Sequence, residues 1–303
     1  MSEIKTVHII GLGAVGATYA SLFHKMNPNS VKIVVDENRF KQYSTGILIN
    51  GSRYYFDCVV PDKESPEAEF ILIATKGHHL PEAIETIKPL VGKNTIILSL
   101  LNGITSENDL SSVFGREKVL HGFCVGLDST RENGEVRFST HGKIVFGEHY
   151  PEAKGKAGPV ADLFSRAGIS HQIPKDILRE MWWKFMMNVG INQTSAVMGA
   201  PYGVYQTIPE ARELLASASR EVLPLAQKEG IDLNESDISE IFRIINTLSP
   251  SGKTSMLQDV EAHRKTEVES FALAVINLGK KHGIATPVNE MLYRLIKVME
   301  ARY

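Results

Sequence analysis

Cysteine is nearly absent from this sequence, because the 303 residues include only Cys58 and Cys124. Their wide separation matches neither a redox pair nor a metal-binding spacing, so we expect both to be reduced and structural. The longest apolar runs, such as FILIAT and TIILSLL, are too short to span a bilayer. The N-terminal segment MSEIKTVHII lacks the layout of a signal peptide, and we therefore expect a cytoplasmic protein.

The sequence also lacks an excess of charge of either sign. It has 33 basic and 35 acidic residues, for a net charge of −2, which predicts neither a nucleic-acid partner nor an anionic membrane surface. A hydrophobic content of 43% with 22% charged residues is typical of a soluble globular protein. The length is sufficient for two domains.

The first half of the chain alternates short apolar runs with segments of helical period. The runs are KTVHIIG, VKIVVD, FILIAT, NTIILSL and KVLHGFCVG. Such runs are typical of strands buried on both faces, and the alternation predicts an α/β domain with a mostly parallel sheet. Later in this half, EVRFSTHG and KIVFGE are expected to form a hairpin.

From about residue 175 to the end, nearly every segment has helical period. Asn234 or Ser236 is expected to cap one helix, and Pro209 suits the first turn of another. We therefore predict an α/β domain over residues 1–174, which the motifs below indicate to be dinucleotide-binding, and a helical domain over residues 175–303, which they indicate to carry the substrate and catalytic residues. A ligand is expected in the cleft between the two domains.

A dinucleotide-binding fingerprint, GLGAVG, follows the first predicted strand and opens a helical segment. Gly11 permits a tight turn, Gly13 lets the backbone approach a pyrophosphate, and Gly16 lets helix and strand pack closely. The pyrophosphate would then lie on the amides at the start of the helix. The predicted cofactor-binding residues at this turn are Gly11, Leu12, Gly13, Ala14, Val15 and Gly16.

Asp36 ends the second predicted strand, 36 − 16 = 20 residues after Gly16, where an acid binds ribose hydroxyls. A carboxylate here favours NAD over NADP, because it repels a 2′-phosphate. Arg39 and Lys41 follow at once and could supply compensating positive charge, although both also suit an ordinary solvated helix start. The residues alone leave both cofactors open.

A polar stripe interrupts the apolar segment MWWKFMMNVGIN. Lys184, Asn188 and Asn192 are spaced by four residues, which places them on one face of a helix. Such a stripe favours a ligand, although a lysine can also pack its stem and extend its ammonium group to water. Considered alone, Lys76, Asn102, Ser255 and Glu267 are each compatible with a loop, a turn, a cap or a solvated face.

Taken together, the motifs resemble the ketopantoate reductases (2-dehydropantoate 2-reductases) over essentially the whole chain. They are GLGAVG, TK at Thr75-Lys76, NG at Asn102-Gly103, WKFMMNVGIN, and TSMLQDVEAHRKTEVE at 254–269. The resemblance implies a Rossmann domain followed by a helical domain like the C-terminal domain of 6-phosphogluconate dehydrogenase. It also implies NADPH-dependent reduction of 2-dehydropantoate to (R)-pantoate, in the biosynthesis of pantothenate and coenzyme A.

The resemblance further implies a role for each candidate residue. Lys184 would be the general acid that protonates the substrate keto oxygen, with Glu267 orienting the substrate hydroxyl and the lysine. Lysine suits this role because partial burial lowers an ammonium pKa towards the working range. The predicted substrate-binding residues are Asn188, Asn192, Ser255 and Asn102. Asn102 would also lie beside the nicotinamide, and Lys76 would reach cofactor or substrate.

Two features depart from the family pattern. Arginine often ends the second strand in this family, whereas this chain has Asp36, which leaves NADH open as the cofactor. The segment after Lys76 reads GHH, where an aromatic residue and a glutamine are common. His78 and His79 are expected to point to different sides, so no metal is predicted.

Two rival functions and the oligomeric state remain open at this stage. The rivals are a paralogue that reduces another 2-oxo acid with NADH, and a non-catalytic dinucleotide-binding sensor. The intact polar set of the helical domain favours an enzyme over a sensor. Apolar stripes on the C-terminal helices fit either a core or a homodimer interface.

Overall fold

The computed structural model describes residues 3–303, which form two compact units. The first unit extends to Leu101 and resumes over Ser106–Ile177; the second comprises Asn102–Thr105 and Leu178–Tyr303. The short segment Asn102–Thr105 therefore belongs to the helical unit, although it follows a strand of the first. Among the described residues, no helix is both long and apolar enough to cross a membrane.

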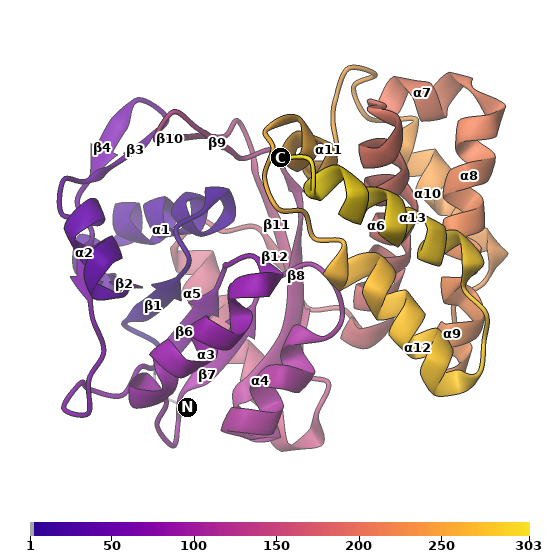
Figure 1. The fold of residues 1–303 in the computed structure, drawn as a ribbon. Helices are drawn as coiled ribbons and strands as arrows, with labels where there is room; N and C mark the ends of the chain where they lie inside the picture. Colours follow the sequence, from indigo (N-terminus) through magenta and orange to yellow (C-terminus); the bar gives the residue numbers. More distant parts are fainter. Residues whose placement is uncertain (1–2) are drawn as a thin grey trace. The chain divides into compact units, whose positions relative to one another are not determined.

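A mostly parallel eight-stranded sheet, ordered β12-β11-β8-β7-β6-β1-β2-β5, organises the first unit (Figure 1). The six strands from β8 to β5 in this order are parallel to one another, β11 is antiparallel to β8, and β12 is parallel to β11. The strands of this sheet are β1 (Val7–Ile10), β2 (Val31–Val34), β5 (Asp57–Val59), β6 (Phe70–Ile73), β7 (Ile96–Ser99), β8 (Val119–Leu127), β11 (His141–Gly147) and β12 (His171–Gln172). The five strands predicted from apolar runs are confirmed as β1, β2, β6, β7 and β8.

Helices cover both faces of this sheet, which explains its continuous apolar strands. In β1, Val7 and Ile9 join a core with α1 and α5, whereas Ile10 joins a second core with α3 and α4. Successive strand residues point to opposite faces, so both faces must be apolar. The helices of this unit are α1 (Ala14–Met26), α2 (Glu37–Tyr43), α3 (Leu80–Ile87), α4 (Ser106–Phe114) and α5 (Ala157–Arg166).

The predicted hairpin between EVRFSTHG and KIVFGE is wrong. The first segment forms β10 (Glu135–Arg137), which pairs with β9 (Thr130–Glu132) and with β3 (Ile47–Ile49) in a separate four-stranded sheet. That sheet is completed by β4 (Ser52–Tyr54). The second segment forms β11, which pairs with β8 instead. The tight turn lies before β10, at Asn133-Gly134, where both residues have positive φ.

A buried carboxyl group lies at the start of α4. The Glu107 side chain is 1% exposed, and Ser106 Oγ donates a hydrogen bond of 3.0 Å to its Oε2 atom. Burial raises the pKa of the Glu107 carboxyl to about 8. The folded protein therefore holds a proton on this group near neutral pH, which the unfolded chain has lost.

Replacing Glu107 with glutamine should remove part of the pH dependence of stability. A raised carboxyl pKa in the folded state makes the free energy of unfolding fall as pH rises, by up to about 1.4 kcal/mol per pH unit near neutrality. Urea unfolding of the wild type and Glu107→Gln at about pH 6.5 and about pH 7.5 measures this effect. Wild type and variant share every other titrating group, so equal pH slopes would contradict the raised pKa.

Helices make up the second unit, with α6 passing through its core (Figure 1). They are α6 (Ile177–Met198), α7 (Tyr202–Thr207), α8 (Pro209–Arg220), α9 (Val222–Lys228), α10 (Glu235–Ile245), α11 (Ser255–Glu261), the π-helix η6 (Glu269–Leu273), α12 (Ala274–His282) and α13 (Pro287–Glu300). Two predicted helix starts are confirmed: Asn234 caps α10 in a capping box, and Pro209 opens α8.

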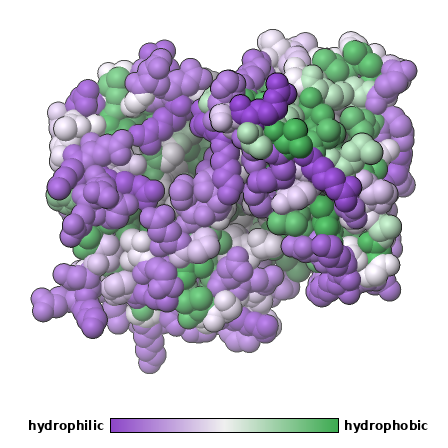
Figure 2. Space-filling view, in the orientation of Figure 1, coloured by the Kyte–Doolittle hydropathy of each residue, from purple (hydrophilic) through white to green (hydrophobic). Residues whose placement is uncertain are grey.

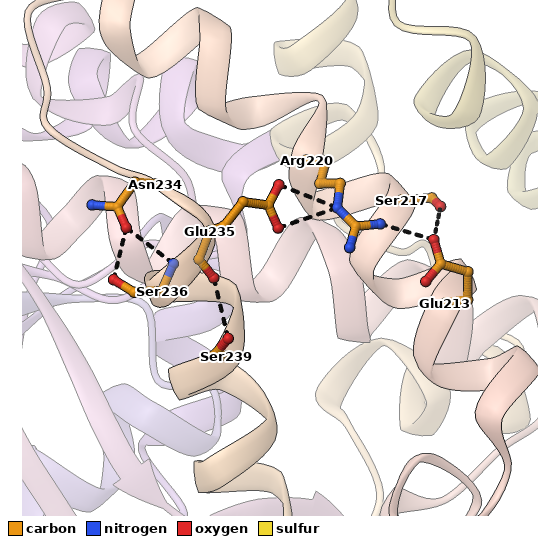
Figure 3. A network of polar contacts seen from close by, with 7 residues as sticks. All are labelled: Glu213, Ser217, Arg220, Asn234, Glu235, Ser236 and Ser239. Carbon is orange, nitrogen blue, oxygen red and sulfur yellow. Dashed lines mark hydrogen bonds and ion pairs between the residues drawn. The ribbon is translucent and has the colours of Figure 1, made fainter.

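A polar network on the surface joins α8 to the start of α10 (Figure 3). Arg220 donates to Glu213 at 2.8 Å and to Glu235 at 3.2 Å, next to the capping residue Asn234. Its side chain is 43% exposed, and exposed ion pairs contribute little to stability. We therefore assign this network to helix packing and not to a ligand site.

Candidate active site

The predicted polar stripe lies on α6. Lys184, Asn188 and Asn192 are 9%, 6% and 6% exposed, and α6 is buried on almost every side over residues 181–196. Buried polar groups need hydrogen-bond partners, because leaving one unpaired costs about 1–3 kcal/mol. Lys184 and Asn192 have partners in segments far away in the sequence, and Asn188 accepts from Asn192 on the same helix.

Asn102 connects Lys184 to Glu267 within the second unit. Lys184 Nζ donates to Asn102 Oδ1 at 3.0 Å, and Asn102 Nδ2 donates to Glu267 Oε2 at 3.0 Å. The amide oxygen thus faces the ammonium group and the amide nitrogen faces the carboxylate, as their charges require. Glu267 is only 7% exposed. The two predicted catalytic residues therefore share one amide, a contact that the sequence did not predict.

The other predicted substrate residues form a second polar group. Asn192 Nδ2 donates to Asn188 Oδ1 at 3.1 Å, and Ser255 Oγ donates to Asn192 Oδ1 at 3.2 Å. Ser255 is exposed at the first turn of α11, where Thr254 serves as the cap. Because Lys184 and Asn188 are one helical turn apart, the two polar groups are neighbours along α6.

Asn102 and Glu267 each lie next to an unusual backbone feature, Gly103 and the π-helix η6. Gly103 has φ of +104°, and a Cβ there would lie 3.3 Å from the carbonyl oxygen of Ser270 in η6. A side chain at this position would therefore be both strained and crowded. Glu267 lies two residues before η6 begins, and π-helical turns are rare and frequent at functional sites.

The glycine fingerprint has the predicted geometry in the first unit. Gly11 has φ of +96°, and its Cβ would lie 2.7 Å from Ala74. A Cβ on Gly16 would lie 1.8 Å from the Gly11 carbonyl oxygen, whereas a Cβ on Gly13 would meet nothing within 4 Å. The first turn of α1 has neither an acidic residue nor a side-chain cap, so its amides suit an anion.

Two further polar groups border this turn. Thr75 Oγ1, two residues after the end of β6, is buried and has no hydrogen-bond partner among residues 3–303. Arg131 of β9 donates through Nη1 to the carbonyl oxygen of Leu12. Arg131 was not among the predicted site residues, because β9 belongs to the sheet that was not predicted. These groups fit an anionic dinucleotide, whose pyrophosphate needs donors and positive charge.

The surroundings of Asp36 are more acidic than the sequence indicated. Asp36 caps α2 through a 2.8 Å bond from the Arg39 amide, and Arg39 Nη1 lies 3.3 Å from Asp36 Oδ2. The same guanidinium is 3.8 Å from Glu82, which lies 3.6 Å from His79. Arg39 therefore already has two carboxylate neighbours.

His78 and His79 do not point to different sides, contrary to expectation. They belong to the short 3-10 helix η2 (Gly77–His79), and their ring centroids lie 4.2 Å apart, so the two imidazole rings are in contact. Across residues 3–303, no three His, Cys, Asp or Glu side chains are grouped as a metal ion would require.

Comparison with known proteins identifies the family. The family described as ketopantoate reductase PanE/ApbA matches residues 7–151, and its C-terminal counterpart matches residues 176–300. The chain belongs to the ketopantoate reductase family. It is accordingly an NAD(P)-dependent oxidoreductase.

Individual relatives of this family member are distant in sequence but match over full length. A 2-dehydropantoate 2-reductase of Streptococcus pyogenes is 26% identical over 300 residues, covering 97% of this chain and 98% of the relative. The crystal structure of 2-dehydropantoate 2-reductase from Geobacter metallireducens is 25% identical, with a TM-score of 0.85 and coverage of 96% and 99%. A D-mandelate dehydrogenase, solved with NADH and anilino(oxo)acetate, has a TM-score of 0.89 at 24% identity and coverage of 98% of each chain.

Proposed function

We propose that this protein reduces 2-dehydropantoate to (R)-pantoate, as a step in pantothenate and coenzyme A biosynthesis. The hydrogen-bonded series of Lys184, Asn102 and Glu267 carries the proposal. It places a buried cation and a buried carboxylate on one amide, which suits the protonation of a keto oxygen. The family membership and the names of the relatives in Streptococcus and Geobacter support the choice of substrate.

In this proposal Lys184 hydrogen-bonds the keto oxygen and gives it a proton. Such general acid catalysis typically contributes about 10²- to 10⁴-fold, and the cation also stabilises the developing alkoxide. The bound dinucleotide supplies the hydride. Glu267 orients the substrate hydroxyl directly and the lysine through Asn102. The Asn188, Asn192 and Ser255 group supplies amide and hydroxyl donors for the remaining substrate oxygens.

The fingerprint turn would hold the pyrophosphate of the cofactor. The amides at the start of α1, the Thr75 hydroxyl and the Arg131 guanidinium are the donors that we assign to this role. Gly13 lets the pyrophosphate approach because that side of the backbone is open. Lys76 follows Thr75 and keeps its predicted role toward cofactor or substrate.

Family resemblance and local charge favour different cofactors. The resemblance to ketopantoate reductases favours NADPH, but Asp36 and Glu82 surround Arg39 and leave little positive charge for a 2′-phosphate. A carboxylate in the position of Asp36 instead accepts hydrogen bonds from a 2′-hydroxyl. This arrangement makes NADH the cofactor that the local charges favour.

Replacing Asp36 with serine should raise the use of NADPH relative to NADH. The change removes one of the two carboxylates near Arg39 and so frees its charge for a 2′-phosphate. We expect the ratio of kcat/KM for NADPH over NADH to rise by about tenfold, equivalent to about 1.4 kcal/mol. Asp57→Ser, on the neighbouring strand, is the control. An unchanged ratio would show that Asp36 does not contact the ribose.

The proposed reaction is tested by the initial rate of NADPH or NADH oxidation with 2-dehydropantoate. Rapid turnover with either cofactor supports the proposal. A second candidate, favoured by the charges around Arg39, is reduction of another 2-oxo acid with NADH. Faster turnover of another 2-oxo acid in a substrate panel would favour that candidate. Cofactor binding without turnover of any 2-oxo acid would instead indicate a sensor.

We also propose that this protein forms a homodimer through an apolar face of α13. Met291, Leu295 and Val298 of α13 are 63%, 43% and 62% exposed and share one face of the helix. Figure 2 shows apolar surface in the region of this helix. Light scattering of the purified protein gives its mass, and a Leu295→Glu variant tests whether this face forms the contact.

A further inference from the structure

The segment that carries Glu267 has no regular secondary structure. Residues 262–268 follow the end of α11 at Glu261 and precede η6, which begins at Glu269. Helical hydrogen bonds therefore do not fix the direction of the Glu267 side chain. One local bond, from the Ser270 amide to the Glu267 carbonyl oxygen at 2.9 Å, ties this residue to η6, and contacts with other elements hold the rest of the segment.

Thr266, the residue before Glu267, is bound to Glu300 in the last turn of α13. The Thr266 amide donates to Glu300 Oε1 at 2.8 Å, and the Thr266 hydroxyl donates to the same oxygen at 2.7 Å. Thr266 is 1% exposed and the Glu300 side chain 10% exposed. Hydrogen bonds to a charged acceptor in such a shielded position are stronger than those at the surface.

Lys297, one turn earlier on α13, binds Glu269, the residue that directly follows this segment. Its Nζ atom donates to Glu300 Oε2 at 2.8 Å and to Glu269 Oε1 at 3.1 Å. Hydrogen bonds to Glu300 and Glu269 raise the pKa of Lys297. Burial alone would raise the pKa of Glu300, but the hydrogen bonds from Lys297 and Thr266 outweigh it and lower that pKa. Both groups are therefore charged at neutral pH.

We propose that Lys297 and Glu300, which we call the α13 clamp, are positioning residues for the carboxylate of Glu267. The clamp holds the residue before Glu267 and the residue two positions after it. A displacement of about 1 Å at a catalytic group can cost up to about 10²-fold in rate. The inference rests on the proposed function, because the clamp affects the rate only where Glu267 takes part in the reaction.

Glu300→Ala removes the acceptor of both Thr266 bonds and should lower kcat by about tenfold. The KM for the dinucleotide should stay within about twofold of wild type, because the fingerprint turn belongs to the other unit. The pH profile of kcat should also shift, since Glu267 would no longer face Asn102 in one position. A merely structural role would lower the thermal midpoint and the fraction of active protein without moving that profile.

Two further variants make the result specific. Glu300→Gln keeps an oxygen that accepts from Thr266 but loses the acceptor of Lys297, so kcat should recover in part, to within about threefold of wild type. Glu290→Ala removes an exposed carboxylate of the same helix, which pairs with Arg294 at 3.0 Å, and should leave kcat unchanged. A wild-type kcat and pH profile in Glu300→Ala would overturn the clamp while leaving the proposed reaction intact.

Hydrogen exchange separates failure of the clamp from failure of the proposed function. The amides of Glu267 and Val268 should exchange faster in Glu300→Ala than in wild type or Glu290→Ala, measured without substrate. If the wild type reduces no 2-oxo acid, the proposed function fails. The exchange rates of these two amides then still show whether the clamp holds the segment. Unchanged exchange at both amides would overturn the clamp whatever the activity.

Discussion

Lys184→Ala is expected to lower kcat by at least about 10²-fold while leaving cofactor affinity nearly unchanged. The lysine is 9% exposed and donates to Asn102, so its loss removes the buried cation and disconnects the amide from its partner. The fingerprint turn that would bind the cofactor belongs to the first unit, whereas Lys184 belongs to the second. Single-turnover rates with 2-dehydropantoate and fluorescence titration with NADH and NADPH measure the two effects separately.

Two further variants test whether the charge or the proton of Lys184 is needed for turnover, and whether the effect is specific to this lysine. Lys184→Arg keeps the positive charge but cannot readily release a proton, so recovery in this variant would assign the lysine an electrostatic role. Lys281→Ala removes a 60% exposed lysine of the same unit that pairs with Glu229, and it should have no effect on kcat. Turnover at the wild-type level in Lys184→Ala would exclude the lysine from the mechanism.

Gly16→Ala is expected to impair both stability and cofactor binding. A Cβ there would lie 1.8 Å from the Gly11 carbonyl oxygen, so α1 must move away from the fingerprint turn. Overpacking of this kind costs about 1–3 kcal/mol, and the rigid main-chain neighbour suggests the upper end. The shift should also weaken NADH binding by at least about tenfold, since the amides at the start of α1 move with the helix. Urea unfolding and NADH titration measure the two losses.

Gly158→Ala provides the matched control. This glycine also lies in a helix, α5, but a Cβ there would meet nothing within 4 Å. Alanine has the higher helix propensity, by about 1 kcal/mol, so this variant should be equally stable or more stable. If Gly16→Ala behaved in the same way, close packing would not be the reason for glycine at position 16.

The sequence predicted five of the eight strands of the main sheet because their apolar runs are local signals. The run FILIAT, for example, is apolar at every core position of β6 and needs no distant partner to be recognised. The four-stranded sheet was missed because its strands are three residues long and only partly buried. Its clearest signals were two Asn-Gly pairs, Asn50-Gly51 and Asn133-Gly134, which turn β3 into β4 and β9 into β10 with positive φ.

In the candidate site too, features set by local sequence were predictable, and contacts between distant residues were not. The spacing of Lys184, Asn188 and Asn192 predicted their common face, because helical period is a local property. The bond from Lys184 to Asn102 joins residues 82 positions apart, and no spacing rule connects them. Family resemblance selected both residues but did not predict that one amide joins Lys184 to Glu267. Nothing in the sequence indicated that Glu300 binds Thr266.

The π-helix η6 also constrains how this protein can change in length during evolution. Leu273 bonds back to the carbonyl of Val268, five residues earlier, so this turn holds one residue more than a regular helix would. Deleting one residue from Glu269–Leu273 would let the chain continue as a regular helix. The deletion would also rotate the residues that precede η6 by about 100° around the helix axis relative to α12. Glu267 would then turn away from Asn102 without any change in its own identity. Insertions and deletions should therefore be as strongly disfavoured here as substitution of the carboxylate itself.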